Sequence, residues 1–162
     1  MLKYAIWHWD NNKSELEEAI RTDATMNSCD YEHLVKLVIR HILNGKNRIE
    51  YYVGQGWSEN IHVIDDGDYQ GTLLFAIHLD TYQPSSYEYI LTTVEYGSCS
   101  GCDALLSIQD YCSGRLKENQ IKEMMDLCKD IVTSMVQPFR GRYGFDLDKI
   151  MEDEHAEYSG NH

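Results

Sequence analysis

The chain has 162 residues, of which 43% are hydrophobic and only two are proline, and this composition fits one folded domain with a hydrophobic core. Its 27 acidic residues outnumber the 14 basic ones and give a formal net charge of −13. An acidic chain without a basic stripe argues against direct binding to nucleic acid. The charge favours solubility alone, a cationic protein partner, or mimicry of nucleic acid toward a DNA-binding protein.

The sequence gives no sign of export or membrane insertion. No apolar run approaches the length that spans a bilayer, and the first ten residues contain neither an apolar signal-peptide core nor a cleavage site. We therefore expect a cytoplasmic protein without membrane contact. The five cysteines are expected to be reduced thiols in that compartment.

The first part of the chain alternates between irregular and helical patterns. Residues 3–9 predict a short strand or a docked arm, and the polar cluster at residues 10–12 predicts a turn. A helix is expected over residues 13–21. Asp30 is the expected N-cap of a stronger helix over residues 31–43, because apolar residues repeat there at helical spacing.

The middle of the chain predicts short strands separated by turns. Residues 48–53 form a possible strand, and residues 61–64 and 87–96 are rich in β-branched and aromatic residues. Residues 72–79 are almost continuously apolar, which is typical of a central strand with both faces covered. The last three strands are expected to pair as an antiparallel meander.

The last part of the chain predicts two helices and a tail. A short helix opens near Asp103, with Asp103 or Ser100 as its expected N-cap, and ends at about residue 111. An amphipathic helix covers residues 116–136. The acidic residues 146–162 predict a flexible tail. The predicted fold is therefore a single α+β domain, residues 1–145, with a three- or four-stranded antiparallel sheet flanked by helices.

The turn between the last strand and the short helix carries the sequence Cys99-Ser100-Gly101-Cys102, which allows several kinds of chemistry. A thiol near a helix N-terminus has a lowered pKa and can exchange disulfides, although no βαβ unit precedes this one. Two thiols also supply half of a zinc site, which Cys112, Cys128 or a histidine could complete. The backbone N–H groups could bind an anion. Alternatively, the glycines only satisfy tight backbone geometry while the thiols pack inside. The candidate metal ligands are Cys99 and Cys102, and the candidate binding residues are Tyr96, Ser98, Ser100 and Asp103.

A second polar cluster lies between two predicted strands. Asp65, Asp66 and Asp68 could bind a divalent cation through their carboxylate oxygens. The segment lacks the spacing of a calcium-binding loop, and aspartate with glycine is also what a tight hairpin requires. The hairpin is the favoured interpretation, with Tyr69 and Gln70 as candidate surface determinants.

The N-terminal segment Trp7-His8-Trp9-Asp10 is the third cluster. Exposed tryptophans would form an aromatic contact patch of the kind that anchors interfaces, and buried ones would belong to the core. We expect one of the two tryptophans in the core and leave the other open. The sequence has no Ser/His/Asp order, phosphate-binding loop or H-E-x-x-H motif, which favours a role other than catalysis.

Two strings of the sequence are distinctive, D-D-G-D-Y-Q-G at residues 65–71 and Y-G-S-C-S-G-C-D at residues 96–103. With W-H-W-D at residues 7–10 and Y-Q-P at residues 82–84, they resemble a family of small proteins encoded by phages and prophages of Gram-positive bacteria. The resemblance covers most of the chain but carries over no catalytic residues. It implies a setting in the cytoplasm of a bacterial host, where such accessory proteins often bind host components, including defence nucleases.

The leading hypothesis is a non-enzymatic, acidic phage accessory protein that binds a host protein and modulates it, in particular as an inhibitor of a nucleic-acid-binding defence nuclease. The alternative is a small-ligand or zinc-binding protein that uses the turn at residues 97–103, with Asp65, Asp66 and Asp68 as neighbours. A thiol oxidoreductase is the third hypothesis.

Overall fold

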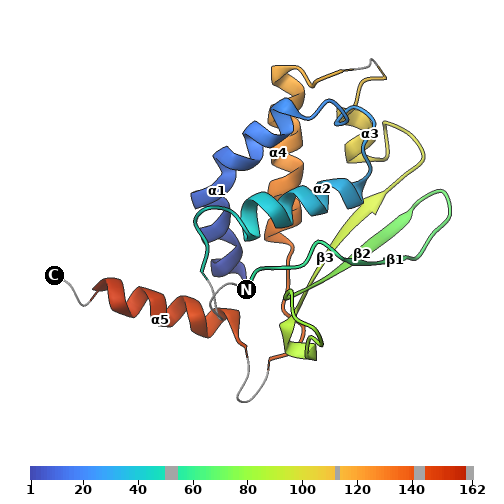
Figure 1. Cartoon of the computed structure of the whole chain (residues 1–162). Helices are drawn as coiled ribbons and strands as arrows, with labels where there is room; N and C mark the ends of the chain where they lie inside the picture. The colour runs from blue at the N-terminus through green and yellow to red at the C-terminus, as the bar shows by residue number, and fades with distance from the viewer. Residues whose placement is uncertain (50–54, 112–113, 141–144, 160–162) are drawn as a thin grey trace.

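The computed structural model describes residues 1–49, 55–111, 114–140 and 145–159, with side chains described as far as residue 153. Within these segments the chain forms helices and one antiparallel sheet of strand order β1-β2-β3, so the predicted α+β class is confirmed. In Figure 1, α1, α2 and α4 pack together beside the sheet, and the hairpin of β1 and β2 projects away from them. In chain order the elements are α1 (Leu2–Thr22), α2 (Tyr31–Val38), β1 (His62–Asp65), β2 (Gly71–His78), β3 (Tyr89–Tyr96), α3 (Ala104–Ile108), α4 (Glu118–Thr133) and α5 (Leu147–Ser159).

Helix α1 is continuous over 21 residues, so the helix expected over residues 13–21 is confirmed as its second half, whereas the strand expected over residues 3–9 and the turn expected over residues 10–12 are wrong. Asn12, expected in a turn, is buried because its amide donates to the Ile42 carbonyl and accepts from the Asn47 N–H. No helix in the described part of the chain, including α1, is long and apolar enough to cross a membrane. The buried residues of α1 recur at helical spacing and are Tyr4, Ala5, His8, Trp9, Asn12, Leu16 and Ile20.

The helix expected over residues 31–43 is confirmed, with a change of winding near its end. It runs as α2 to Val38 and then as a π-helical turn over Ile39–Leu43. The Asp30 side chain caps its N-terminus by accepting a hydrogen bond from the His33 N–H at 2.9 Å, as expected.

The expected antiparallel meander is confirmed, and each strand begins and ends within two residues of its predicted bounds. In the register, Asp65 of β1 faces Leu73, and Tyr96 of β3 faces Gly71. Because both neighbours of β2 reach the same end of the sheet, Asp65 and Tyr96 lie near each other. The strand expected over residues 48–53 falls largely outside the described residues.

Strand β2 is central, as predicted, but only its inner half is covered on both faces. Phe75, Ile77 and His78 are buried, whereas residues 71–74 are half-buried. The helices α1, α2 and α4 form a helical layer, and the outer half of the sheet extends beyond it (Figure 1). This arrangement leaves room for a pocket and a projecting hairpin.

The two helices that follow the sheet are shorter than expected. Asp103 caps α3, as predicted, but the helix ends at Ile108 instead of residue 111. Helix α4 ends at Thr133 because Val136 forms an antiparallel bridge with Leu91 of β3, which replaces the last helical turn. Its predicted apolar face is buried and includes Ile121, Met124, Cys128, Ile131 and Val132.

The acidic C-terminal segment differs from the flexible tail that the sequence predicts, because helix α5 begins at Leu147. Leu147 and Met151 are buried, and the Asp148 carboxylate pairs with the amino group of Met1. The hydrogen bond from that amino group is the main cause of the lowered pKa of Asp148. The expectation of a solvated tail therefore does not hold for residues 146–151.

Candidate functional site

The aspartate turn and the cysteine turn meet at one end of the sheet. The Tyr96 hydroxyl donates a hydrogen bond of 2.5 Å to Asp65 Oδ1, across 31 positions of sequence. This bond is the largest cause both of the lowered pKa of Asp65 and of the pKa of about 12 at Tyr96. Because both shifts favour a protonated phenol beside an ionised carboxylate, the contact is a charge-assisted hydrogen bond near neutral pH.

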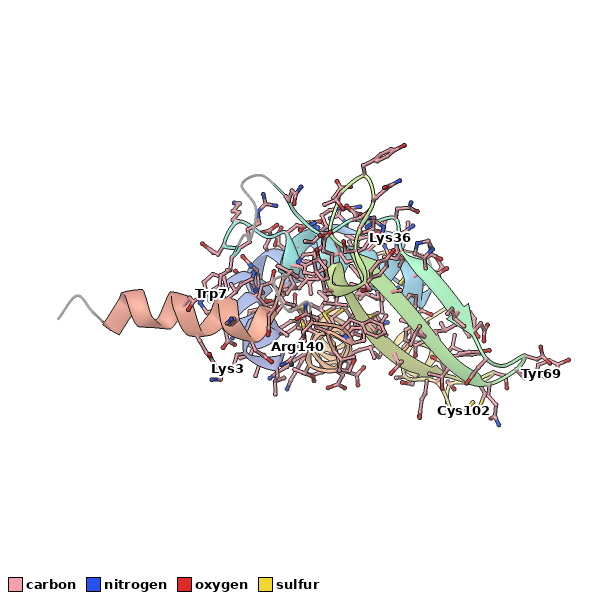
Figure 2. The ribbon with its side chains drawn as sticks, turned by 90° about the horizontal axis from the view of Figure 1, so that it is seen from below. Lys3, Trp7, Lys36, Tyr69, Cys102 and Arg140 are labelled. Carbon is pink, nitrogen blue, oxygen red and sulfur yellow. The ribbon has the colours of Figure 1, made fainter. Side chains whose placement is uncertain are left out.

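The turn between β1 and β2 is held by its own aspartates. Asp65 Oδ1 accepts from the Gly67 N–H at 3.0 Å, and Asp66 Oδ1 accepts from the Thr72 N–H at 2.6 Å. The predicted hairpin interpretation is therefore confirmed. At the tip, Tyr69 is 82% exposed, and Figure 2 shows it at the far end of the hairpin.

Asp103 is the buried anchor of the cysteine turn. Its Oδ1 accepts from the Tyr31 hydroxyl at 2.9 Å and from the Leu106 N–H at 3.0 Å, and its Oδ2 accepts from the Gly97 N–H at 3.0 Å. The Tyr31 hydroxyl in turn accepts from the Leu105 N–H at 3.1 Å. Burial is the main cause that raises the pKa of Tyr31 well above its usual value. This network joins the starts of α2 and α3 to the end of β3.

The two thiols of the cysteine turn are exposed and adjacent. Cys99 Sγ and Cys102 Sγ lie 2.8 Å apart, and the Cys99 N–H donates to Cys102 Sγ at 3.2 Å. The hydrogen bond from the Cys99 thiol is the largest cause of the lowered pKa of Cys102. A Cβ at Gly97 would lie 2.5 Å from Cys102 Sγ, so this glycine is needed for the close turn. The alternative in which these thiols pack inside the protein is therefore wrong.

A pocket of about 430 Å³ opens beside this network, between the sheet and the N-terminal ends of α2 and α3. Val63, Leu73, Phe75 and Leu105 give it apolar walls. We use the name hairpin end for this pocket together with the aspartate turn, residues 65–71, and the cysteine turn, residues 97–103. Of the fourteen lining residues none is Lys, Arg or His, and four are acidic: Asp30, Glu32, Asp65 and Asp103.

The described residues do not complete a zinc site around Cys99 and Cys102. No group of three or more His, Cys, Asp or Glu side chains in these segments is arranged to hold a metal ion. Cys128 is fully buried in the core, and Cys112 falls outside the described part of the chain. Two thiolates on one tetrahedral zinc would also stand about 3.8 Å apart, which is well beyond the observed 2.8 Å.

The aromatic cluster on α1 belongs mainly to the core. Trp9 is 6% exposed, as expected for one of the two tryptophans, and Trp7 is partly buried against the core. His8 is buried, with Nδ1 2.8 Å from the Tyr4 carbonyl and Nε2 accepting from the Ile49 N–H at 3.1 Å. These partners require a neutral ring with its proton on Nδ1, and burial lowers the pKa of His8 to about 4.

The predicted site residues divide into three groups. Asp65, Tyr96 and Asp103 line the pocket together. Asp66 holds the turn, while Asp68, Tyr69 and Gln70 are exposed at its tip. Ser98 and Ser100 are exposed on the cysteine turn. In Figure 2, Cys102 and Tyr69 lie at the same end of the molecule.

The sequence did not identify the contribution of α2 to this site. The sequence predicts Asp30 only as a helix cap and indicates no role in a site for Tyr31 or Glu32. Tyr31 meets Asp103 across 72 positions of sequence, and no local spacing indicates such a contact. A tyrosine directly after an N-cap, in a helix with an otherwise aliphatic stripe, was the available signal.

No model of a known protein family, no curated protein and no solved structure matches this chain.

Proposed function

We propose that the protein acts by binding a basic protein and that the hairpin end is the contact surface. The observation that carries this proposal is the pocket, which has apolar walls and four acidic lining residues and, within the described chain, no basic one. A lysine or arginine side chain has an apolar stem and a cationic head, so it matches both properties.

Asp103 is buried and already accepts three hydrogen bonds within the protein, so the other three lining carboxylates would receive such a cation. Asp65 is ionised and lies beside the Tyr96 hydroxyl, and Asp30 is exposed at the start of α2. Glu32 pairs with Lys36 at 3.1 Å on the surface of α2, an interaction that a competing guanidinium can displace at modest cost. Entry of a partner's cationic side chain would neutralise part of this acidic rim.

The projecting hairpin adds a second contact area. Tyr69 is 82% exposed and Ile64 is 61% exposed on the edge strand β1, next to the aspartate turn. Tyrosine is enriched at protein interfaces because its rigid ring gives a large contact area with a polar tip. A partner whose basic side chain fills the pocket could therefore also pack on the hairpin.

The resemblance to phage and prophage proteins directs the proposal to a partner in a bacterial host. Defence nucleases are the first candidates because their nucleic-acid surfaces are basic. The net charge of −13 would attract such a surface from a distance. The protein would then compete with nucleic acid for binding to that surface. In this proposal the protein inhibits its partner by occupying that surface, and it needs no catalytic residue.

The test compares capture of host proteins by the immobilised chain and by two tyrosine variants. We expect specific capture at low salt and its loss at high salt, because the screening length falls from about 10 Å at 0.1 M to about 3 Å at 1 M. Tyr69→Ala should weaken capture of that protein by about tenfold or more. Tyr82→Ala is the matched control, because Tyr82 is 98% exposed in the loop at the opposite end of β2.

Absence of any specific partner at low salt would contradict the proposal. Equal loss of capture with Tyr69→Ala and Tyr82→Ala would show that general acidity, and not the hairpin end, holds the partner.

The pocket volume also favours a second candidate, a small cationic ligand in the same place. A native mass spectrum of the protein purified without chelator or reductant distinguishes the two. A retained organic cation that is lost in Asp65→Asn would support the small ligand. A bare polypeptide mass would favour the protein partner.

A further inference from the structure

The cysteine turn carries two adjacent, exposed thiols that have no part in the proposed partner binding. Both thiols are exposed, and their sulfurs lie 2.8 Å apart. A disulfide bond is about 2.05 Å long, so bond formation requires the sulfurs to approach by less than about 1 Å. Figure 2 shows Cys102 at the surface at the hairpin end, where a small reactant can approach it.

We propose that Cys99 and Cys102 form a redox-active dithiol, which closes reversibly to an intramolecular disulfide by exchange with small-molecule disulfides of the glutathione class. This inference is independent of the proposed protein partner.

The exchange proceeds through a mixed disulfide. The Cys102 thiolate attacks one sulfur of the small disulfide, which forms a Cys102–S–S–R bond and releases one RS⁻. Cys99 then attacks Cys102 Sγ, forms the intramolecular bond and releases the second RS⁻. The two cysteine protons end on the two released thiols. The protein has lost two electrons and two protons, and the small disulfide has gained both.

The geometry assigns the attack to Cys102. Its sulfur accepts hydrogen bonds from the Cys99 N–H at 3.2 Å and from the neighbouring Cys99 thiol, and these donors stabilise a thiolate. The pKa of Cys102 is lowered accordingly, although the charge of Asp103 acts in the opposite direction. Cys99 lies in position to resolve the mixed disulfide.

The two other described cysteines differ in their environment. Burial raises the pKa of Cys29 to about 11 and that of Cys128 to about 12, so both stay protonated near neutral pH. Cys128 is also fully buried. Among the described thiols, oxidation should therefore select Cys99 and Cys102.

The test incubates the full chain in buffers of varied reduced and oxidised glutathione and measures intact mass after alkylation. We expect a species that has lost two hydrogens, with the bond mapped by peptide mass to Cys99 and Cys102 and fully reversed by dithiothreitol. Cys99→Ser and Cys102→Ser should each lose this species completely, whereas Cys29→Ser should keep it. Cys99→Ser should accumulate a stable glutathione adduct on Cys102.

Both tested cysteines are exposed, so their serine variants should fold, which circular dichroism checks. Reduced thiols in excess oxidised glutathione would overturn the proposal. A disulfide mapped to another pair would do so too, as would a bound zinc ion that protects both thiols from alkylation.

Discussion

The helical layer and the hairpin end are stabilised by different interactions and differ in how much of their side-chain surface is exposed. In the layer, Leu16, Leu34, Ile42 and Met124 are completely buried and stabilise the fold by packing. In β1, which leads into the hairpin end, all four residues are exposed, and hydrogen bonds to carboxylates hold the two turns of the hairpin end. The difference separates residues that the fold needs from residues that are free to serve recognition.

The same comparison indicates that, in the proposed binding, the acidic charge has its largest effect at the pocket. Away from the pocket, surface carboxylates pair with nearby cations, as Glu17 does with Arg21 and Glu59 with Arg40. Around the pocket, the acidic residues gather over an apolar floor without a basic residue in the described lining. Side-chain packing stabilises the helical layer, and in our proposal the acidic charge at the hairpin end gives specificity for a basic partner.

The largest expected effect is in the core. Leu16→Ala should lower the free energy of unfolding by about 2–5 kcal/mol, because it removes a fully buried side chain and leaves a cavity. Ile64→Ala, at an apolar residue that is 61% exposed on β1, should change it by less than about 0.5 kcal/mol. Urea denaturation measures both, and equal losses would contradict the division between the two regions.

Asp103 belongs to the hairpin end but is buried, and we expect it to contribute to the free energy of unfolding as a core residue does. Asp103→Ala should cost about 2–4 kcal/mol, because it removes a helix cap and leaves the Gly97 N–H and the Tyr31 hydroxyl without their acceptor. Asp68→Ala at the exposed tip is the matched control and should cost less than about 0.5 kcal/mol. Thermal and urea unfolding compare them, and a cost for Asp68→Ala as large as that of Asp103→Ala would refute the assignment.

The buried histidine of the layer should make stability depend on pH. In the unfolded chain His8 takes up a proton near pH 6.5, whereas in the folded protein burial holds its pKa at about 4. Stability is therefore fully present above pH 6.5 and falls as the pH drops toward 4, by up to about 3 kcal/mol. His8→Gln should flatten the loss between pH 7 and 5 in urea titrations, and an unchanged slope would contradict this.

A smaller effect separates two glycines of the cysteine turn. Gly97→Ala should cost about 1–3 kcal/mol, because its Cβ would lie 2.5 Å from Cys102 Sγ and 2.8 Å from the Cys102 carbonyl oxygen. Gly101→Ala meets its nearest atom at 3.9 Å and should be tolerated. The rate of thiol labelling at Cys102 should rise only in the first variant. Similar rates in both would show that Gly97 does not shape the turn.

The sequence predicted the features that depend on local patterns. The α+β class, the meander, the cap at Asp30 and the cap at Asp103 follow from periodicity and from side chains that bond their own backbone. The hairpin over residues 65–71 followed from turn chemistry in the same way.

The errors have long-range causes. Asn12 looked like a turn residue because its partners, Ile42 and Asn47, are distant in sequence. The pocket could not be predicted because it depends on α2 lying against the end of β3, which the Tyr31–Asp103 hydrogen bond fixes. Polar residues with distant partners have no local signature.

The most direct test of the hairpin end as a cation-binding surface is chemical-shift mapping by NMR, with a short oligoarginine peptide as the probe. A chain of net charge −13 will attract this peptide weakly at many places, so the position of the largest shifts is decisive. We predict the largest changes around the pocket, at Asp65, Leu73 and Tyr96, with their loss in Asp65→Asn. Largest changes along the acidic surface of α1, at Glu17 and Glu18, would contradict the account.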